Sequence, residues 1–160
     1  ILNSADSNDS KLIAHINTAD LIYLTGGDPL HLLTSLRNSL FLKKIRKAVD
    51  RGAILAGSSA GAMVLGSSMM YQGWRRALGF IQSTVILPHH EKNDPGQISK
   101  QLRTSGPDRV RILGIESMTC CFINKDYWQV IGSGNVTSYC RDSWCQFTSG
   151  ETIVFPPKYH

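Results

Sequence analysis

The sequence lacks the features that mark several special classes of protein. No apolar run approaches the ~20 residues that a membrane-spanning helix needs, so we expect no membrane partner. There is no internal repeat and no low-complexity segment, which argues against a solenoid or a disordered chain. The 4 cysteines form no C-x-x-C pair and have no histidine at zinc spacing, so reduced structural thiols are favoured over a disulfide or a metal site. Reduced thiols in turn favour a cytoplasmic location.

The composition is that of a globular domain. The 160 residues suffice for one domain with a sizeable core, and 42% of them are hydrophobic. The net charge is +5, and the positive side chains are densest over residues 43–52, where their spacing indicates the solvated face of an amphipathic helix. We expect no nucleic-acid partner, because no aromatic residues alternate with these charges.

Two kinds of apolar pattern alternate along the chain. Continuous runs of strand length are typical of strands covered on both faces, and segments with helical spacing separate them. Buried strands are expected over 21–25, 53–58, 83–89 and 111–116. Short helices are expected over 8–20 and after residue 59, and further helices over 30–40, 41–52 and 96–104. This alternation predicts an α/β fold with a doubly wound, mostly parallel sheet of the flavodoxin-like type.

Beyond residue 116 the pattern changes to short strands. A C-terminal β meander is expected, with strands over 119–124, 128–132, 136–140 and 152–155. A doubly wound sheet usually begins with a strand, whereas this sequence begins with a predicted helix. We therefore expect a single α/β domain over residues 1–160 that lacks one or two N-terminal strand–helix units.

The stretch 57–61, Gly-Ser-Ser-Ala-Gly, fits the pattern G-x-S-x-G. In that pattern the central serine lies on a tight turn between a strand and a helix, with glycines where side chains would collide. A buried run precedes the motif and small residues follow it, so Ser59 is the candidate nucleophile. The backbone N–H of Ala60, at the start of the predicted helix, is suited to a developing oxyanion. The alternative is an ordinary turn that contains serine.

A serine nucleophile needs a base, and polar residues lie at the ends of two further buried strands. His89 and His90 follow one of these strands, and one of the two is the candidate base. Glu116 ends the next strand and is the candidate acid that orients the imidazole. Gly27 follows the first strand at the same edge and could present a second N–H to the oxyanion. A plain turn ended by Pro29 is the alternative there.

The chain resembles the aspartyl dipeptidase (peptidase E) and cyanophycinase family of serine peptidases. The resemblance is carried by Gly-Gly-Asp at 26–28, Gly-x-Ser-Ala-Gly-Ala at 57–62 and Pro-His at 88–89, in that order. It implies a fold like that of class I glutamine amidotransferases. It also implies hydrolysis of peptide bonds adjacent to aspartyl residues in a small peptide substrate, without a cofactor or a metal. A homodimer is left open.

The resemblance also implies a role for individual residues. Ser59 maps to the nucleophile, and His89 rather than His90 maps to the base. The backbone N–H groups of Gly27 and Ala60 map to the oxyanion hole.

One position departs from the family pattern. Where the family has its acid, this chain has Ser117, and Glu116 lies one residue earlier. Neighbouring residues of a strand point to opposite faces, so either a bulge brings Glu116 round or the acid is missing. The alternative function is therefore a catalytically impaired family member that serves as a binding or structural module.

A substrate with an aspartyl residue calls for a cationic anchor. Arg75 and Arg76 follow the elbow helix and could supply it, the alternative being a solvated loop. Trp74 beside them would either line a pocket or pack against the domain.

Overall fold

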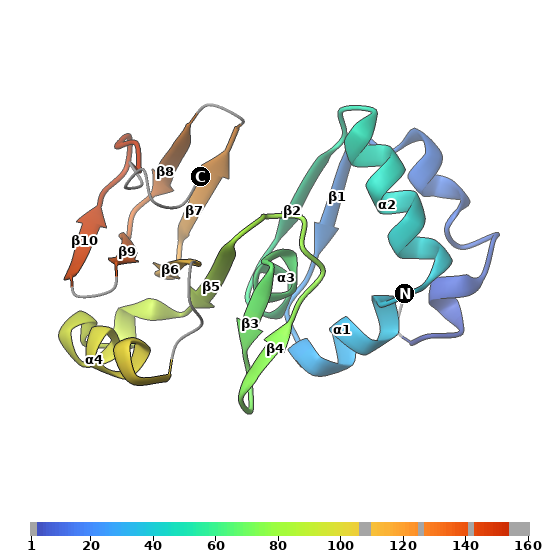
Figure 1. Cartoon of the computed structure of the whole chain (residues 1–160). Coiled ribbons are helices and arrows are strands. Elements are labelled where there is room, and N and C mark those ends of the chain that lie inside the picture. Colours follow the sequence, from blue (N-terminus) through green and yellow to red (C-terminus); the bar gives the residue numbers. More distant parts are fainter. Residues whose placement is uncertain (1–2, 106–109, 125–126, 141–142, 154–160) are drawn as a thin grey trace.

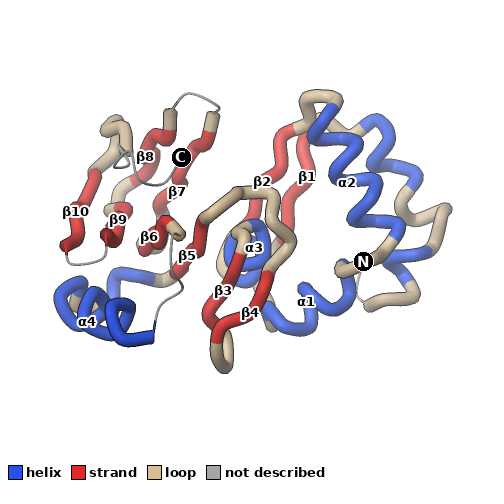
Figure 2. The backbone as a smooth tube through the Cα atoms, viewed as in Figure 1, coloured by secondary structure: helices blue, strands red, loops and turns tan. Residues whose placement is uncertain are grey.

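The computed structural model describes residues 3–105, 110–124, 127–140 and 143–153. The N-terminal half of the chain lies to the right in Figure 1 and the C-terminal half to the left. Helices are concentrated in the first half and strands in the second (Figure 2). None of the helices within the described ranges is long and apolar enough to cross a membrane.

The N-terminal half is built on a parallel pair of strands. β1 (Leu21–Leu24) pairs with β2 (Ile54–Gly57), so that both strands end at the same edge. Parallel neighbours need a crossover connection, which α1 (Pro29–Leu36) and α2 (Leu40–Asp50) supply.

Side-chain caps decide where the two crossover helices begin. The Asp28 carboxylate accepts a hydrogen bond from the backbone N–H of His31 at the start of α1, at 2.6 Å. Ser39 caps α2 in the same way, because its hydroxyl accepts from the N–H of Leu42 at 3.0 Å. Between the helices Asn38 has φ 62°, a left-handed conformation that ends the first helix.

The C-terminal half is built on a mixed sheet of four strands in the order β10-β9-β6-β5. β5 (Thr84–Pro88) and β6 (Arg111–Ile115) are parallel and are joined through α4 (Pro95–Ser105). β9 (Val136–Cys140) runs antiparallel to both β6 and β10 (Ser143–Phe147). The ends of β5 and β6 therefore lie at one edge, with Pro88 opposite Ile115.

Two antiparallel hairpins complete the fold. β3 (Ser68–Met70) pairs with β4 (Trp74–Arg76) between the two halves of the molecule (Figure 1). β7 (Thr119–Ile123) pairs with β8 (Trp128–Gly132).

The predicted α/β class is confirmed. The described strands, however, form several separate sheets, one of which is mixed, and not the single, mostly parallel sheet that was expected. The parallel pairs β1–β2 and β5–β6 belong to separate sheets, and the C-terminal strands are shared between the mixed sheet and the β7–β8 hairpin. The hairpin β3–β4 and the strand β10 were not predicted. Of the strand expected over 152–155, Thr152 makes an isolated bridge to Gln129, and 154–155 lie outside the described residues.

The helix predicted over residues 8–20 is wrong. Two short 3-10 helices lie in this part of the chain: η1 (Asp6–Asn8), which ends where the expected helix would begin, and η2 (Ala14–Thr18) within the expected range. The Asp9 carboxylate accepts a hydrogen bond from the backbone N–H of Lys11 at 2.7 Å. A side chain that bonds to the backbone two residues ahead competes with helix formation, and so it divides the segment.

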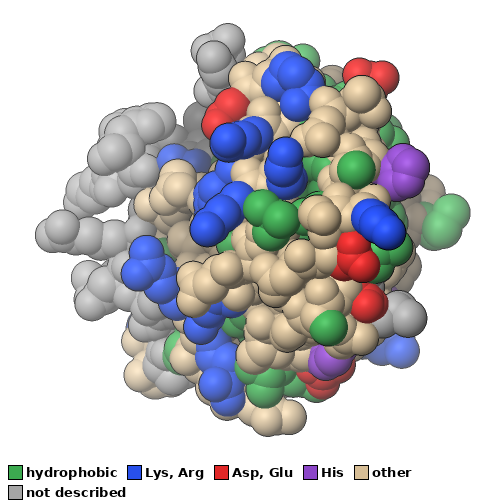
Figure 3. All heavy atoms as spheres, turned by 90° about the vertical axis from the view of Figure 1, so that its right-hand side faces the viewer, with side chains coloured by type: hydrophobic (Ala, Val, Ile, Leu, Met, Phe, Trp, Pro, Cys, Tyr) green, Lys and Arg blue, Asp and Glu red, His purple; other side chains and the backbone are tan. Residues whose placement is uncertain are grey.

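The basic stretch of α2 behaves as predicted for an amphipathic helix. Lys and Arg side chains cross the face shown in Figure 3 in a loose band. Several of them bond within the protein: Arg46 donates to the carbonyl of Leu78 at 2.6 Å and lies over the ring of Phe80. Lys44 donates to the Asn17 side chain at 2.9 Å.

The short helix α3 (Ala60–Leu65) holds the two halves together. It packs against β1, β2 and β5, and Val64 at its centre is fully buried. Its backbone approaches β1 so closely that a Cβ on Gly61 would collide with the carbonyl oxygen of Leu24. A Cβ on Gly57 would lie 2.6 Å from the backbone of Gly61. The glycines of the motif are thus required by backbone contact between α3 and the strands.

We predict that Gly61→Ala lowers the free energy of unfolding by about 2–3 kcal/mol, because the methyl group has only rigid backbone to displace. Urea unfolding followed by circular dichroism measures this. Gly96→Ala in α4 is the matched control, since a Cβ there meets only the Asp94 carboxylate oxygen, at 3.2 Å. Equal stability of the two variants would contradict the packing argument.

Candidate active site

Ser59 lies at the turn between β2 and α3, outside both elements. Its backbone has φ 49° and ψ −115°, a strained conformation for a residue with a side chain. The turn is closed by a hydrogen bond from the N–H of Gly61 to the carbonyl of Ser58 at 2.8 Å and by one from Met63 to Ser59 at 3.0 Å. These hydrogen bonds and the glycine contacts keep the backbone in the strained conformation. The Ser59 side chain is half-buried.

His89 and His90 follow β5 and point in different directions. His89 is exposed, and its Nε2 lies 3.0 Å from Oγ of Ser59. Its φ of 56° and ψ of 40° turn the chain sharply after Pro88. His90 is 2% exposed, and its Nε2 is hydrogen-bonded to the hydroxyl of Tyr139 on β9. The structure therefore brings His89, and not His90, to the candidate nucleophile.

His90 is part of the interior of the C-terminal half. Its ring lies against Gly114 of β6, where a Cβ would collide with it, and edge-on to Tyr139 at a centroid distance of 5.5 Å. Burial lowers the pKa of His90, an effect that the negative charges of Glu116 and Glu91 oppose. Burial, together with the charge of Asp94, also raises the pKa of Tyr139 to about 12.

The Glu116 carboxylate is engaged by Asn135. It accepts a hydrogen bond from the Asn135 backbone N–H at 2.8 Å and further bonds from the Asn135 side-chain amide at 3.2 and 3.3 Å. Within the described residues, no hydrogen bond joins Glu116 to His89. Its role as the orienting acid stays a prediction.

Ser117, at the position where an acid was expected, binds a different carboxylate. Its hydroxyl donates to Oε1 of Glu91 at 2.8 Å, and its backbone N–H donates to Oε2 at 3.0 Å. Glu91 was not among the site residues predicted from the sequence. The available signal was its place two residues after His89, at the edge where β5 and β6 both end.

The Gly26-Gly27 turn lies beside the candidate nucleophile. A Cβ on Gly26 would come within 3.4 Å of the Ser59 Cβ, and Gly27 has φ 135°. The Tyr71 hydroxyl on the β3–β4 turn donates to the carboxylate of Asp28 at 2.8 Å, which ties the hairpin to this turn. Hydrogen bonds from the backbone of His31 and from Tyr71 lower the pKa of Asp28.

The expected oxyanion donors are consistent with this arrangement. Ala60 is the first residue of α3, so its N–H has no partner within the helix. Gly27 lies on the neighbouring turn. Their role as an oxyanion hole stays a prediction.

The candidate anchors lie on β4. Arg75 folds back on its own hairpin, donating to the carbonyls of Tyr71 at 3.1 Å and Gln72 at 3.4 Å. Arg76 is exposed, and its carbonyl accepts a bond from Arg37. Trp74 is half-buried and packs against the core that includes β5.

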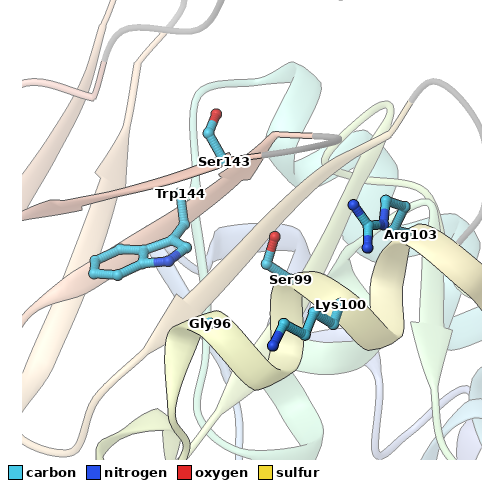
Figure 4. A pocket seen from close by; sticks show the side chains of 6 residues that line it. All are labelled: Gly96, Ser99, Lys100, Arg103, Ser143 and Trp144. Atoms are coloured by element: carbon cyan, nitrogen blue, oxygen red, sulfur yellow. The ribbon is translucent and has the colours of Figure 1, made fainter.

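Two surface hollows lie away from Ser59 and His89. One, of about 370 Å³ between α4 and β10, is lined by Gly96, Ser99, Lys100, Arg103, Ser143 and Trp144 (Figure 4). The other, of about 380 Å³, is lined by Arg37, Asn38, Leu42, Arg46, Arg76, Ala77 and Leu78. Neither includes the candidate nucleophile or base.

The side chains that the structure describes bear on metal and thiol chemistry. Among them, no group of three or more His, Cys, Asp or Glu residues could hold a metal ion. Cys120, Cys121 and Cys145 carry free thiols. Burial raises the pKa of the Cys121 thiol to about 12, aided by Cys120, so it is protonated at neutral pH. The Cys140 side chain lies outside the described residues.

Comparison with known proteins points to one group. The model of peptidase family S51 matches residues 1–131. A cyanophycinase of Trichormus variabilis is 34% identical over 143 residues, covering 80% of this chain and 47% of that protein. A cyanophycinase of Geminocystis herdmanii is 33% identical over 144 residues, covering 81% of this chain and 52% of that protein. The chain thus spans about half the length of these relatives.

A solved structure shares the fold. The crystal structure of a peptidase from an acI-B1 Actinobacterium matches with a TM-score of 0.82 at 29% identity. The match covers 97% of this chain and 67% of that one. The α/β arrangement described above is therefore that of a solved peptidase.

We predict that stability falls as the pH drops from 7.5 to 5.5, because protonation of His90 favours the unfolded chain. The pKa of His90 is lower in the folded chain than in the unfolded chain, where it is about 6.5. The contribution of His90 to the free energy of unfolding is therefore complete above pH 6.5 and is lost as the pH falls below that value. The carboxyls of Asp28 and Glu91, whose pKa values are also lowered, stay ionised in this window. Urea unfolding at both pH values measures the difference.

In His90→Asn the free energy of unfolding should change less between pH 7.5 and 5.5 than it does in the unsubstituted chain. His15→Gln, which removes an exposed histidine from η2, is the control and should keep the full dependence. An unchanged pH dependence in His90→Asn would show that another group is responsible.

Proposed function

The chain belongs to peptidase family S51, and on that premise we propose that it hydrolyses an amide bond of a small peptide with Ser59 as nucleophile and His89 as general base. The observation that carries the proposal is the 3.0 Å separation of Ser59 Oγ and His89 Nε2 at a strained strand-to-helix turn. A hydroxyl within reach of an imidazole nitrogen is the arrangement that activates a serine.

The reaction follows from this geometry in two halves. Ser59 Oγ attacks the carbonyl carbon as its proton passes to Nε2 of His89, and the carbonyl oxygen becomes an oxyanion. The N–H groups of Gly27 and Ala60 stabilise that charge. His89 then gives its proton to the departing amine, which leaves an acyl group on Ser59. Water, deprotonated by His89, then attacks the acyl carbon, and His89 returns the proton to Ser59 Oγ as the bond to the acyl group breaks, which releases the acid.

The turn at Ser59 contributes by fixing the hydroxyl before substrate arrives. Its backbone conformation is held by the contact of α3 with β1, so attack requires no reorganisation of the chain. A nucleophile held in this way gains the rate advantage of a preset geometry.

We further propose that the substrate carries an aspartyl residue next to the bond that breaks. This proposal is supported by the likeness to proteins named cyanophycinase and by Arg75 on β4, which donates to the carbonyl of Tyr71, the residue bonded to Asp28. Arg75 and Arg76 are the candidate anchors for the aspartyl carboxylate. Whether the chain forms a homodimer is left open and is to be measured.

The second candidate function is a binding or structural module with little or no hydrolysis. The observation that favours it is that the Glu116 carboxylate bonds to Asn135 and, among the described residues, makes no hydrogen bond to His89. An imidazole without an orienting acid is a weaker base in this mechanism.

We predict that a fluorophosphonate probe labels this chain at Ser59, because an activated serine attacks phosphorus as it attacks a carbonyl. Ser59→Ala should abolish labelling, and His89→Gln should slow it by at least about 10³-fold. Intact-protein mass spectrometry measures the adduct. Ser99→Ala, which removes a hydroxyl on α4, is the control and should label at the normal rate. A chain that does not label would favour the binding module.

We predict a preference for an aspartyl residue over asparagine at the same position in a panel of dipeptides and isopeptides. Arg75→Gln or Arg76→Gln should raise KM for the aspartyl substrate by about tenfold or more, since a hydrogen bond to a charged group is worth about 1.5–3 kcal/mol. The Asn substrate should be unaffected. Lys43→Gln on α2 is the charge-matched control, and an equal KM in all variants would exclude both anchors.

A further inference from the structure

The Glu91 carboxylate is fixed beside the candidate base by a set of donors. It belongs to η3 (His90–Lys92), two residues beyond His89. Ser117 donates to both of its oxygens, at 2.8 and 3.0 Å, and its own backbone N–H is a further donor. The carboxylate is therefore held in one orientation, although it lies at the surface.

The sheet explains why these residues meet. β5 and β6 are parallel, and Pro88 at the end of one lies opposite Ile115 at the end of the other. The segments that follow the two strands leave the sheet at the same edge. His89 and Glu91 come from the first segment and Ser117 from the second.

The charge of Glu91 interacts with both His89 and His90. The donors named above and the positive charge of His89 lower the pKa of Glu91 to about 2. Glu91 is therefore ionised throughout the pH range in which a histidine base works. Other charged or titratable groups nearby are His90, on which both Glu116 and Glu91 act, Lys92 in η3, and Asp94, which acts on Tyr139.

We propose that Glu91, held by Ser117, is the positioning carboxylate that supports His89 during catalysis, in the place foreseen for Glu116. The inference rests on the proposed function. When Ser59 transfers its proton to Nε2, the His89 ring becomes positive, and the nearby negative charge stabilises that state. Glu91 itself neither gains nor loses a proton. The proton on His89 passes on to the leaving amine.

Direct loss of an orienting acid in a serine triad costs about 10⁴ in kcat. Glu91 acts on His89 through its charge, and no direct hydrogen bond joins the two within the described residues. We therefore expect Glu91→Gln to lower kcat by about 10- to 100-fold, with KM changed less than about twofold. Ser117→Ala keeps the negative charge of Glu91 but removes one of the donors that hold it. Its effect on kcat should therefore be smaller than that of Glu91→Gln, and the two effects should not add fully in the double variant.

The dependence of kcat/KM on pH between 5 and 9 separates an electrostatic role of Glu91 from a purely structural one, because a purely structural role would leave the shape of the profile unchanged. In Glu91→Gln the acid limb of the kcat/KM profile should shift to lower pH, because the charge that favours the protonated ring is gone. Raising the salt from about 0.05 M to about 1 M should shrink the difference between the two proteins, since the screening length falls to about 3 Å. Asp50→Asn, at the end of α2 and the opposite edge of the first sheet, is the charge-matched control.

A comparison of Glu91→Gln with Glu116→Gln decides between the two carboxylates. If Glu91→Gln keeps the normal kcat and acid limb while Glu116→Gln loses them, the proposal is overturned. Thermal melting of each variant separates loss of fold from loss of function.

A measurement independent of turnover keeps the inference distinct from the proposed function. The ring resonances of His89, followed by NMR as the pH is changed, should have a lower midpoint in Glu91→Gln than in the unsubstituted chain. If no chain labels with the fluorophosphonate probe, the proposed function fails, and the NMR midpoint still decides whether Glu91 acts on His89. An unchanged midpoint in Glu91→Gln overturns the proposal.

Discussion

The close contact between α3 and β1 is the constraint on which the rest of the site depends. Gly61 lies against the carbonyl of Leu24 without room for a Cβ, and Gly57 lies against Gly61. The chain can reach α3 from β2 only through a sharp turn, and Ser59 occupies that turn with a backbone conformation that a side chain disfavours. Packing of the helix against the strands offsets this strain and sets the direction of the hydroxyl.

The position of the candidate base, His89, depends on the parallel strands β5 and β6 of the four-stranded sheet. α3 contacts β5 as well as β1 and β2, which brings the end of β5 to the turn at Ser59. The left-handed conformation of His89 then separates two adjacent histidines. His89 turns outward to Ser59, whereas His90 turns inward below Gly114, where only a residue without a Cβ leaves room for its ring.

The sequence was sufficient for features that local pattern encodes. The strands β1, β2, β5 and β6, the helices α1, α2 and α4, the elbow at Ser59 and the family were predicted, because apolar periodicity and glycine spacing report them directly. The expectation that all four strands are buried on both faces holds for β5 and β6 but is wrong for β1 and β2, where Leu21, Tyr23 and Ile54 are exposed. Pairing between distant strands is not encoded locally. β10 is mostly exposed, with a burial pattern that shows no buried face. The bond between Ser117 and Glu91 joins residues 26 positions apart, and no local pattern reports such a contact.

The two carboxylates at this edge keep it negatively charged, although Ser117 lies where the resemblance led us to expect an acid. Glu116 accepts from the backbone and side chain of Asn135, so its charge is used to hold the segment between β8 and β9. Ser117 has no charge of its own, but its two donors fix a carboxylate from the neighbouring strand's segment. An electrostatic requirement concerns where a negative charge lies and not which residue carries it. A search for one acid at one sequence position would therefore miss an arrangement in which a serine positions the acid of another segment.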